Sequence, residues 1–564
     1  MKRLLMGGTV VNVFTGALER ENVLIEDERI VGVGDYTVAD ADLVEDVTGK
    51  FICPGLIDGH IHIESTMLTP TELTKICMPH GTTAIVADPH EIANVCGVDG
   101  IRYMLEASRG LPMHVYFAIP SCVPATPFDE SGAVLRAEDI EPFYGEDAVV
   151  GLAEMMNYPG VLAGDPDVLA KLAGAKKYGK VIDGHAPFLS GKALDAYVAA
   201  GIQSDHECSN FDEALEKLRR GQWIMVRQGT AARNLEALLP LFDEPYCQRA
   251  ILVTDDRHPA DLMREGHIDN IIRLAVQHGK SAVTAIQMAT LRAAQCFGLR
   301  HVGAVAPGYR ADVVVLDDLD SFAVRDVYSS GVKVVENRTT CAIAEPKISD
   351  TLRRTVSDSF HLAPLSPENF RIEEKGKTCR VIGVLAGELI TPEEQMEIDW
   401  SKNNGVDTDR DILKLAVIER HHNTGHRGVG FIHGIGLKKG AIASSVSHDS
   451  HNIIVIGTND TDMSLAANRI REVGGNVIVA DGKIVAEMQL PIAGLMTDRS
   501  GEEIAEANER VRRKVCELGV ADGIEPFMNM AFVSLSVIPS LKMTTQGLVD
   551  VDRQARVSLY VEEK

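Results

Sequence analysis

The sequence has few aromatic residues, fewer basic than acidic residues and no long apolar run. Of its 564 residues, 5% are aromatic, and 56 Lys and Arg stand against 81 Asp and Glu, which gives a formal net charge of −25. A protein that binds nucleic acid neutralises phosphates with a basic stripe, and no such stripe is evident. No apolar run approaches the length that spans a membrane. We therefore expect neither nucleic acid nor a membrane as a partner.

Cysteine pairs with the spacing of a disulfide framework or a metal site are also missing. The ten cysteines are scattered at irregular intervals, with no CxxC pair. This pattern suits reduced thiols. The first residues faintly resemble the basic start of a signal peptide, but Gly7, Gly8 and Asn12 interrupt any apolar core. These features predict a cytoplasmic protein.

The pattern of the chain predicts three parts. Residues 1–50 and 301–341 alternate in short strand-like pieces, and we expect them to complete one composite β-sandwich. Residues 51–300 alternate short apolar runs with helix-like segments such as 165–178, 191–200 and 210–220. Residues 342–564 predict a further C-terminal α/β domain, with strands near 452–457 and 476–480.

Eight apolar runs in the central part predict a (β/α)8 TIM barrel of typical size. The runs are residues 51–57, 82–87, 114–119, 149–153, 181–183, 201–204, 223–226 and 250–253. A doubly wound open sheet is the alternative, but it explains less well why polar residues follow so many strands. The predicted fold class is therefore α/β: a TIM barrel with a flanking β-sandwich and a C-terminal α/β domain.

His60 and His62 end the first apolar run and form the most informative pair in the chain. Residues two apart in a strand point to the same face, so both imidazoles can converge on one point. Imidazole is the commonest metal ligand among side chains, and barrels carry their chemistry at the carboxyl ends of their strands. Taken alone, the pair is equally compatible with a surface location that binds no metal.

Four further strands end in side chains of the metal-ligand type: Glu154, His185, His206 and Asp255. Taken singly, a rim histidine is more often hydrogen-bonded than metal-bound, and a carboxylate after a strand is usually a helix cap or solvated. Five strands that deliver such groups together predict two divalent ions bridged by a carboxylate. Two ions lower the pKa of a shared water and polarise the attacked group, and Asp255 could collect the proton. The implied chemistry is metal-assisted hydrolysis.

These residues resemble a known family. The stretch Pro54-Gly-Leu-Ile-Asp-Gly-His-Ile-His62, followed by His185, His206 and Asp255, resembles the amidohydrolase superfamily, including its flanking sandwich. Five further stretches are similar to bacterial adenine deaminases over essentially the full length: residues 89–95, 228–234, 254–259, 448–457 and 491–496. The resemblance implies deamination of adenine to hypoxanthine and ammonia in purine salvage, with Mn²⁺ or Fe²⁺, in a homo-oligomer. The ligand types also admit Zn²⁺.

The residue at the end of the fourth strand distinguishes members of the amidohydrolase superfamily from one another. Hydantoinase-like and dihydroorotase-like members bridge their metals with a carboxylated lysine, whereas Leu152-Ala-Glu154-Met155 offers no lysine. The resemblance therefore implies Glu154 as the bridge. A cyclic amide hydrolase of the same superfamily is the first rival function. A non-catalytic barrel scaffold is the second, although such scaffolds tend to lack the metal ligands that this chain keeps.

The loop after the second strand, Asp88-Pro-His90-Glu91, should overlook the same rim. We expect Glu91, helped by His90, to shuttle a proton to the purine ring or the departing ammonia, while Asp88 holds the loop, contacts substrate or binds an additional ion. The alternative is that these carboxylates only cap the helix that begins near Glu91.

Three residues are candidates for contact with the base. Asp256 resembles the substrate-reading aspartate that follows the metal aspartate in related purine deaminases, and Arg227 and Gln228 follow the seventh strand. Gln228 could equally pack its loop. In the C-terminal part, the histidines of residues 421–426 and 448–451 admit a metal-binding interpretation, but we favour a structural role for them. One of these loops could cover the site.

Overall fold

The computed structural model describes residues 1–230, 232–521 and 523–561. Ala231, within the stretch 228–234 noted above, and residues 522 and 562–564 lie outside this description. Two compact units are present. Unit 1 comprises residues 1–89, 104–121 and 136–347, and unit 2 comprises residues 90–103, 122–135 and 348–564. The division into three domains stays a prediction.

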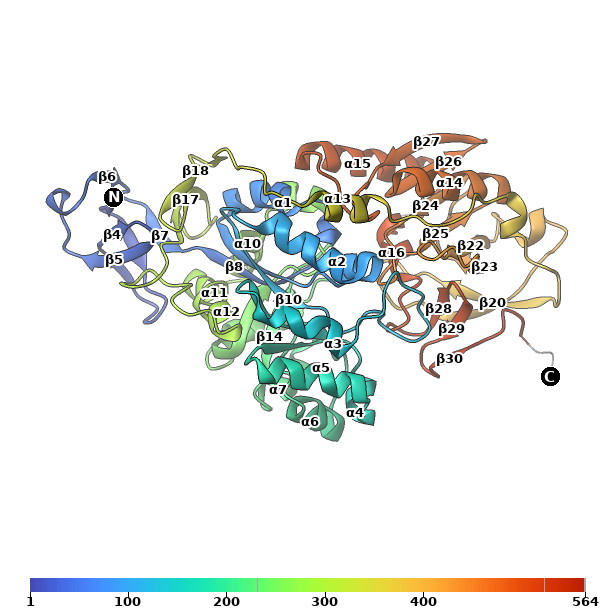
Figure 1. Cartoon of the computed structure of the whole chain (residues 1–564), viewed down its shortest axis with the longest axis horizontal. Helices are drawn as coiled ribbons and strands as arrows, with labels where there is room; N and C mark the ends of the chain where they lie inside the picture. The colour runs from blue at the N-terminus through green and yellow to red at the C-terminus, as the bar shows by residue number, and fades with distance from the viewer. Residues whose placement is uncertain (231, 522, 562–564) are drawn as a thin grey trace. The chain divides into compact units, whose positions relative to one another are not determined.

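Unit 1 contains the parallel strands of an α/β barrel of the TIM type (Figure 1). One sheet has the order β12-β11-β10-β9-β8 and another the order β13-β14-β15, and all these pairs are parallel. A parallel bridge between Ile61 and Asp255 joins the two sheets at one seam. The strands are β8 (Leu56–Ile61), β9 (Thr82–Ala87), β10 (His114–Ile119), β11 (Val149–Met155), β12 (Val181–Gly184), β13 (Ser204–Asp205), β14 (Trp223–Arg227) and β15 (Ala250–Val253).

Helices alternate with these strands, and their sequences explain where several of them begin. The Asp165 side chain accepts hydrogen bonds from the N–H groups of Asp167 and Val168 at the start of α5, and Asn210 accepts one from Glu213 at the start of α7. The three helix-like segments expected at 165–178, 191–200 and 210–220 are confirmed as α5, α6 and α7. The helices are α1 (Pro70–Cys77), α2 (His90–Ser108), α3 (Ala137–Ile140), α4 (Tyr158–Ala163), α5 (Pro166–Lys177), α6 (Gly191–Ala199), α7 (Phe211–Leu218), α8 (Leu235–Leu238), α9 (Pro259–Glu265), α10 (Ile268–Gln277), α11 (Ala282–Met288) and α12 (Leu291–Cys296).

The first apolar run does not form a single barrel strand, so that expectation is wrong. Residues Phe51–Pro54 form β7, which pairs with β16 and β2 in a flanking sheet, and only β8 belongs to the barrel. Gly59 of β8 lies close to the neighbouring strand β15, because a Cβ built on Gly59 would lie 2.6 Å from Ile251 Cδ1. This close approach helps to bring the end of β8, with His60, beside the end of β15.

Two flanking sheets of unit 1 share one hydrophobic core. Their orders are β5-β4-β1-β6 and β19-β18-β17-β16-β7-β2-β3, so strands from both ends of the unit's sequence pair with each other. Leu5, Ile25, Ile52, Val313 and Val315 are buried together between them. The strands are β1 (Lys2–Met6), β2 (Thr9–Val11), β3 (Leu18–Arg20), β4 (Asn22–Glu26), β5 (Arg29–Gly34), β6 (Leu43–Asp46), β7 (Phe51–Pro54), β16 (Val313–Leu316), β17 (Val324–Ser329), β18 (Val332–Glu336) and β19 (Thr339–Thr340).

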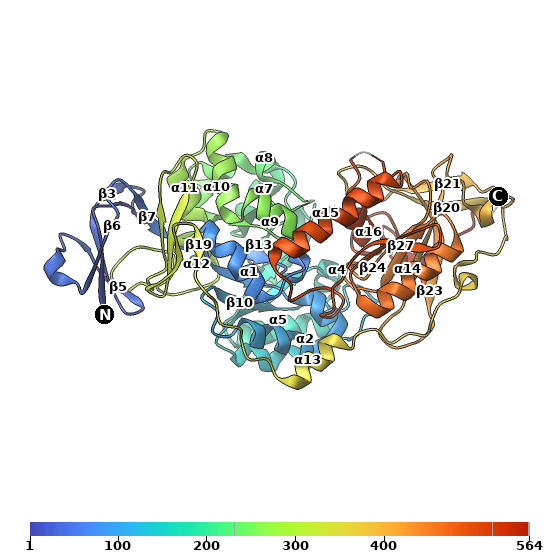
Figure 2. The same cartoon turned by 90° about the horizontal axis from the view of Figure 1, so that it is seen from above.

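Unit 2 is built around an eight-stranded sheet of order β21-β20-β23-β22-β25-β24-β26-β27. Helix α14 lies along this sheet (Figure 2). Its Met463, Ala467 and Ile470 are buried in one core with Val455 and Val477 of the sheet. The strands are β20 (Thr378–Gly383), β21 (Glu393–Glu397), β22 (Leu413–Ile418), β23 (Arg427–His433), β24 (Ala441–Ser444), β25 (Ile453–Gly457), β26 (Asn476–Ala480) and β27 (Lys483–Met488), with β28 (Leu541–Thr544), β29 (Gly547–Asp550) and β30 (Ala555–Arg556) in a small separate sheet. The helices are α13 (Asp350–Ser357), α14 (Asp460–Val473), α15 (Gly501–Glu517) and α16 (Pro526–Phe532).

Within the described residues, every helix is too short or too polar to cross a lipid bilayer. All ten cysteines are free thiols.

Candidate metal centre

The six predicted ligands meet at the carboxyl ends of the barrel strands. His60 and Glu154 are the penultimate residues of β8 and β11. His62, His185 and His206 directly follow their strands, and Asp255 is the second residue after β15. His62 Nε2 lies 3.1 Å from Asp255 Oδ1 and 3.4 Å from Glu154 Oε1. Five of the side chains are buried, and only His185 is partly exposed. The strands therefore bring together the nitrogen and oxygen atoms that a cation requires.

Glu154 occupies the middle of this group, with a different pair of histidines at each oxygen. Oε1 faces His62 at 3.4 Å and His60 at 3.9 Å. Oε2 faces His185 at 2.8 Å and His206 at 3.3 Å. Burial raises the pKa of Glu154, but the neighbouring His206 and His185 outweigh it and hold that pKa well below its usual value. An ionised carboxylate between two pairs of imidazoles has the arrangement of a bridging ligand.

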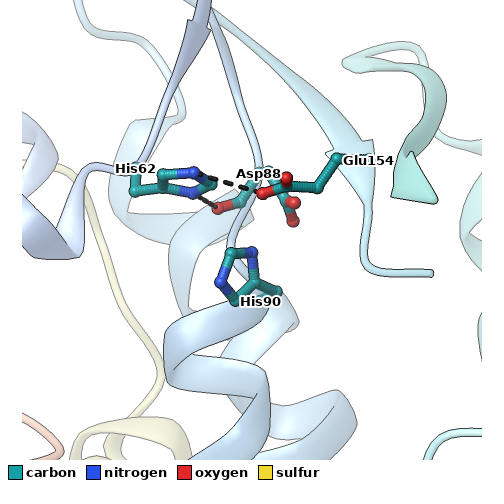
Figure 3. Close-up of side chains that lie close together, drawn as sticks. All are labelled: His62, Asp88, His90 and Glu154. Atoms are coloured by element: carbon teal, nitrogen blue, oxygen red, sulfur yellow. Dashed lines mark hydrogen bonds and ion pairs between the residues drawn. The ribbon is translucent and has the colours of Figure 1, made fainter. Parts of the chain in front are cut away.

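Partners on the far side of the rings fix how His60 and His62 present their nitrogens. His62 Nδ1 donates to the Asp88 carbonyl across 3.1 Å, so its Nε2 is directed at the carboxylates (Figure 3). His60 Nδ1 pairs with Asp183 Oδ2 at 3.0 Å, and its buried Nε2 has no hydrogen-bond partner among the described residues. Metal-ligating histidines are usually held in this way by their second nitrogen.

Charge balance also fits a cation. Burial lowers the pKa of each imidazole, but the carboxylates outweigh it for all four histidines. The pKa of His60 rises to about 9, and those of His62 and His206 rise well above the usual value. The carboxylates thus demand positive charge at the centre of the rim, which divalent cations can supply in place of protons. The residues present fit a pair of such ions.

Asp255 lies in a constrained position beside a buried arginine. Its backbone has a φ of 58°, a region that non-glycine residues seldom adopt, and its N–H donates to the His60 carbonyl across 2.9 Å. Arg227 Nη1 donates to Asp255 Oδ2 across 2.7 Å and also pairs with Glu207. Burial raises the pKa of Asp255, but Arg227 and the histidines hold it well below its usual value. Asp255 is therefore a carboxylate rather than a carboxylic acid.

The other predicted substrate residues of unit 1 lie near the same rim. Asp256 Oδ1 accepts a hydrogen bond of 2.5 Å from the Ser65 hydroxyl. Gln228 is buried, its N–H donates to the Val253 carbonyl at 3.1 Å, and its carbonyl accepts from Arg257 at 2.8 Å. Asp88 N–H donates to the Ile61 carbonyl across 3.1 Å, which ties the loop after β9 to β8.

His90 and Glu91 open helix α2 and belong to unit 2. Glu91 lies with His448 and His451, so the structure brings together residues that the sequence treated separately. The side chains of the histidines of 421–426 bond other partners. His421 Nε2 donates to the Ser450 carbonyl at 2.8 Å. His422 Nε2 contacts the Ser131 carbonyl at 3.1 Å and His426 pairs with Glu130 at 2.7 Å.

Sequence reasoning missed three supporting residues: Asp183, Glu207 and Ser65. Asp183 precedes His185 by two positions and holds His60, while Glu207 directly follows His206 and lies 3.3 Å from its Nε2. Their proximity to predicted ligands was the available signal, because ligating histidines usually have a carboxylate behind them. Nothing local indicated Ser65.

Comparison with known proteins agrees with this geometry. Residues 51–334 match the amidohydrolase family, and residues 388–555 match the adenine deaminase C-terminal domain. An adenine deaminase of Desulfatibacillum aliphaticivorans is 46% identical over 561 residues, covering 99% of this chain and 97% of the relative. The chain belongs to the adenine deaminase family of amidohydrolases. Adenine deaminase 2 of Carboxydothermus hydrogenoformans is 46% identical over 552 residues, or 97% of this chain and 95% of that protein.

Among solved structures, a β-aspartyl dipeptidase of Fervidobacterium islandicum covers 61% of this chain and all of its own, with a TM-score of 0.46 and 16% identity. That likeness is too low to carry an argument about this protein. The family match spans all six candidate ligands, since they lie between residues 60 and 255.

Proposed function

We propose that this chain hydrolyses adenine to hypoxanthine and ammonia as a step of purine salvage. The observation that carries the proposal is Glu154, an ionised carboxylate with two histidines at each oxygen. Relatives named adenine deaminase, similar over nearly the whole chain, support the choice of substrate.

Two divalent cations would be held by the six ligands His60, His62, Glu154, His185, His206 and Asp255. Oxygen and imidazole ligands without thiolate are compatible with Mn²⁺ or Fe²⁺, and Zn²⁺ also accepts them. When bound, the ions supply Lewis acidity, which lowers the pKa of a water and polarises the carbon under attack.

Asp255 is the proton acceptor in this proposal. The Asp255 carboxylate is ionised and lies among the other candidate ligands, so it can take a proton from the attacking water and keep it close to the reacting centre. Glu91, helped by His90, supplies a proton to the ring or to the departing amine. Glu91 follows Asp88 by three residues, so the chain itself keeps it within about 10 Å of the loop after β9.

Asp256 is the proposed reader of the base, with Arg227, Gln228 and Asp88 as further candidates for substrate contact. The carboxylate oxygens of an aspartate accept hydrogen bonds, so Asp256 would bind an N–H of the purine. The Ser65 hydroxyl directs the Asp256 side chain by its short hydrogen bond.

The finer architecture and assembly are also proposals. The common core of the two flanking sheets supports a composite β-sandwich of residues 1–50 and 301–341, and the eight-stranded sheet with α14 supports an α/β domain within 342–564. The family resemblance supports a cytoplasmic homo-oligomer acting on a small-molecule substrate.

Incubation of the Mn²⁺-loaded protein with adenine tests the function. We expect hypoxanthine and ammonia in equal amounts. The Asp255→Asn variant should deaminate adenine at least about 100-fold more slowly than the wild type. The Asp195→Asn variant changes an exposed residue of α6 and serves as the matched control. Ring opening of a hydantoin without ammonia release from adenine would instead support the cyclic amide hydrolase.

A further inference from the structure

Two histidines of unit 2 flank the carboxylate of Glu91. His448 Nδ1 lies 3.6 Å from Glu91 Oε1, and His451 Nε2 lies 3.9 Å from Oε2. All three side chains are buried, with at most 6% of each exposed. One imidazole therefore faces each oxygen of a carboxylate that water hardly reaches.

The segment that carries these histidines is firmly anchored. The buried guanidinium of Arg420 donates to the carbonyls of His451 and Ala493, and the His448 ring stacks on Phe532 with a centroid distance of 4.5 Å. His451 has a φ of 50°, which a non-glycine residue adopts only when its surroundings hold it there. The two imidazoles are thus presented to Glu91 by a rigid support.

The hydrogen bonds of His451 decide which of its nitrogens carries the hydrogen. The Ser447 N–H donates to His451 Nδ1 across 3.3 Å, so Nδ1 is an acceptor and the hydrogen of the neutral ring lies on Nε2. Burial, together with the neighbouring His448 and Arg420, holds the pKa of His451 well below its usual value, so the ring is neutral at physiological pH. His451 therefore points an N–H at Glu91.

This tautomer argues against a metal ion at Glu91, His448 and His451. Ligand atoms of Glu91, His448 and His451 lie within 4.8 Å of one another, which suits a cation by distance alone. A nitrogen that carries hydrogen has no lone pair for a metal, so His451 Nε2 cannot be a ligand while Nδ1 accepts from Ser447. The group is suited to hydrogen bonding to a carboxylate.

Two carboxylates face His448, whereas His451 has the guanidinium of Arg420 as a charged neighbour. Asp449 Oδ1 lies 3.9 Å from His448 Nδ1 and 3.8 Å from His90 Nε2. His448 therefore lies between the carboxylates of Glu91 and Asp449. The carboxylate that pairs with His451 is that of Glu91. His451 Nε2 is directed at Glu91 Oε2 from 3.9 Å, beyond hydrogen-bond distance, and makes no hydrogen bond to the described residues.

We propose that His451 is a positioning residue that orients Glu91 for the proton transfer described above, an inference that rests on the proposed function. Its Nε2–H holds Oε2, so that Oε1 carries the proton that Glu91 delivers to the substrate nitrogen. The O–H bond of Glu91 breaks, an N–H bond forms, and His451 keeps its hydrogen throughout. The 3.9 Å separation shortens in the substrate complex, as catalytic hydrogen bonds do on binding.

A matched pair of variants in the full-length Mn²⁺-loaded protein tests this role. His451→Gln keeps an N–H donor at the Nε2 position, whereas His451→Asn keeps the acceptor for Ser447 but cannot reach Glu91. Each is made alone and with Glu91→Gln, and kcat, KM and metal content are measured. His433→Gln is the control, since His433 pairs with Glu394 at 2.9 Å elsewhere in unit 2.

We expect His451→Asn to lower kcat for adenine about 10- to 100-fold with KM nearly unchanged, and His451→Gln to keep most of the activity. In the Glu91→Gln background, neither substitution should change kcat further, and metal content should stay at the wild-type value. If His451→Asn does not fold, comparing His451→Gln with His448→Gln in the same cycle replaces it. Here His451→Gln should remain near wild-type kcat.

Three outcomes would overturn the inference. An equal loss of kcat with and without Glu91→Gln would show a purely structural role for His451. Wild-type kcat in His451→Asn would remove any role. A wild-type protein that leaves adenine unchanged would instead refute the proposed function itself, and with it the reaction in which Glu91 takes part.

Discussion

Arg227 bonds two carboxylates at once, Asp255 through a 2.7 Å hydrogen bond and Glu207 through both ends of its guanidinium group. The three side chains are largely buried, and the same Asp255 faces His60 and His62 through its other oxygen. Arg227 thus links the candidate metal ligands to a carboxylate, Glu207, that the sequence did not indicate. Its charge keeps both acids ionised in a site with little water.

Replacing Arg227 by Met should destabilise the protein by about 3–5 kcal/mol, because it leaves two buried carboxylates without their cation. Arg227→Lys keeps the charge but loses the two-pronged geometry, and we expect a smaller loss. Urea denaturation at fixed Mn²⁺ concentration measures both. Arg220→Gln breaks an outer pair with Asp195 and should cost no more than about 1 kcal/mol. An equal loss of stability in Arg227→Met and Arg220→Gln would contradict the role of Arg227 as the cation that balances Asp255 and Glu207.

Glu154→Gln should sharply reduce the binuclear metal content, because a neutral amide cannot bridge two cations as a carboxylate does. Elemental analysis of the purified variant, loaded beside the wild type, gives the number of ions per chain. Glu216→Gln, on the outer helix α7, is the control and should retain full content. Full occupancy in Glu154→Gln would remove Glu154 from the bridging position.

Asp183→Asn should weaken metal binding about 10- to 100-fold. Asp183 Oδ2 accepts from His60 Nδ1, whereas the amide of Asn can donate to that nitrogen and so place the ring hydrogen on Nε2, the atom that faces the site. Competition with a fluorescent chelator measures the dissociation constant. The exposed Asp195→Asn variant provides the baseline, and an unchanged affinity would show that Asp183 does not govern the His60 tautomer.

Ser65→Ala should raise KM for adenine about 2- to 10-fold, the loss of one hydrogen bond worth about 0.5–1.5 kcal/mol. Without the hydroxyl donor, Asp256 is free to turn away from the base. We expect kcat and metal content to change little. Steady-state kinetics of the two variants measure kcat and KM. The control is Ser190→Ala, which changes an exposed serine at the start of α6. A lowered kcat at unchanged KM would place Ser65 in the chemical step instead.

Titration of Lys542 should raise the free energy of unfolding of unit 2 as the pH rises above about 7. Its buried ammonium donates to the carbonyls of Phe532 at 3.0 Å and Leu389 at 3.2 Å, and burial lowers its pKa to about 7. The pKa of the unfolded lysine is about 10.4, so between these two values the unfolded chain binds more protons and the free energy of unfolding increases with pH. Below a pH of about 7 both states carry the proton, so the full penalty of burying the ammonium is present and the free energy of unfolding no longer changes with pH through Lys542.

Calorimetry between pH 6 and pH 10 tests the prediction for Lys542. Lys542→Met should show a flatter dependence of Tm on pH than the wild type, while Lys514→Met, at an exposed position of α15, should follow the wild type. Parallel curves for the wild type and Lys542→Met would show that Lys542 is not the titrating group.

Much of the barrel follows from local patterns. Helices α5 to α7 are marked by capping residues and amphipathic spacing, and the later strands by short apolar runs. The first run was misjudged because its first half, β7, pairs with β16, which lies far along the chain. Residues 51–57 contain no local feature that records such a pairing.

The sequence by itself determined which side chains gather at the barrel rim. Strand periodicity and parallel topology place the end of every strand at one edge, so His60, Glu154 and Asp255 could be grouped without coordinates. Only the tertiary structure decided which partner each group received. Arg227 faces Asp255, Asp183 pairs with His60, and Glu91 lies beside His448 and His451. These hydrogen bonds and ion pairs join distant segments, so they depend on how the loops pack. Local sequence does not encode that packing.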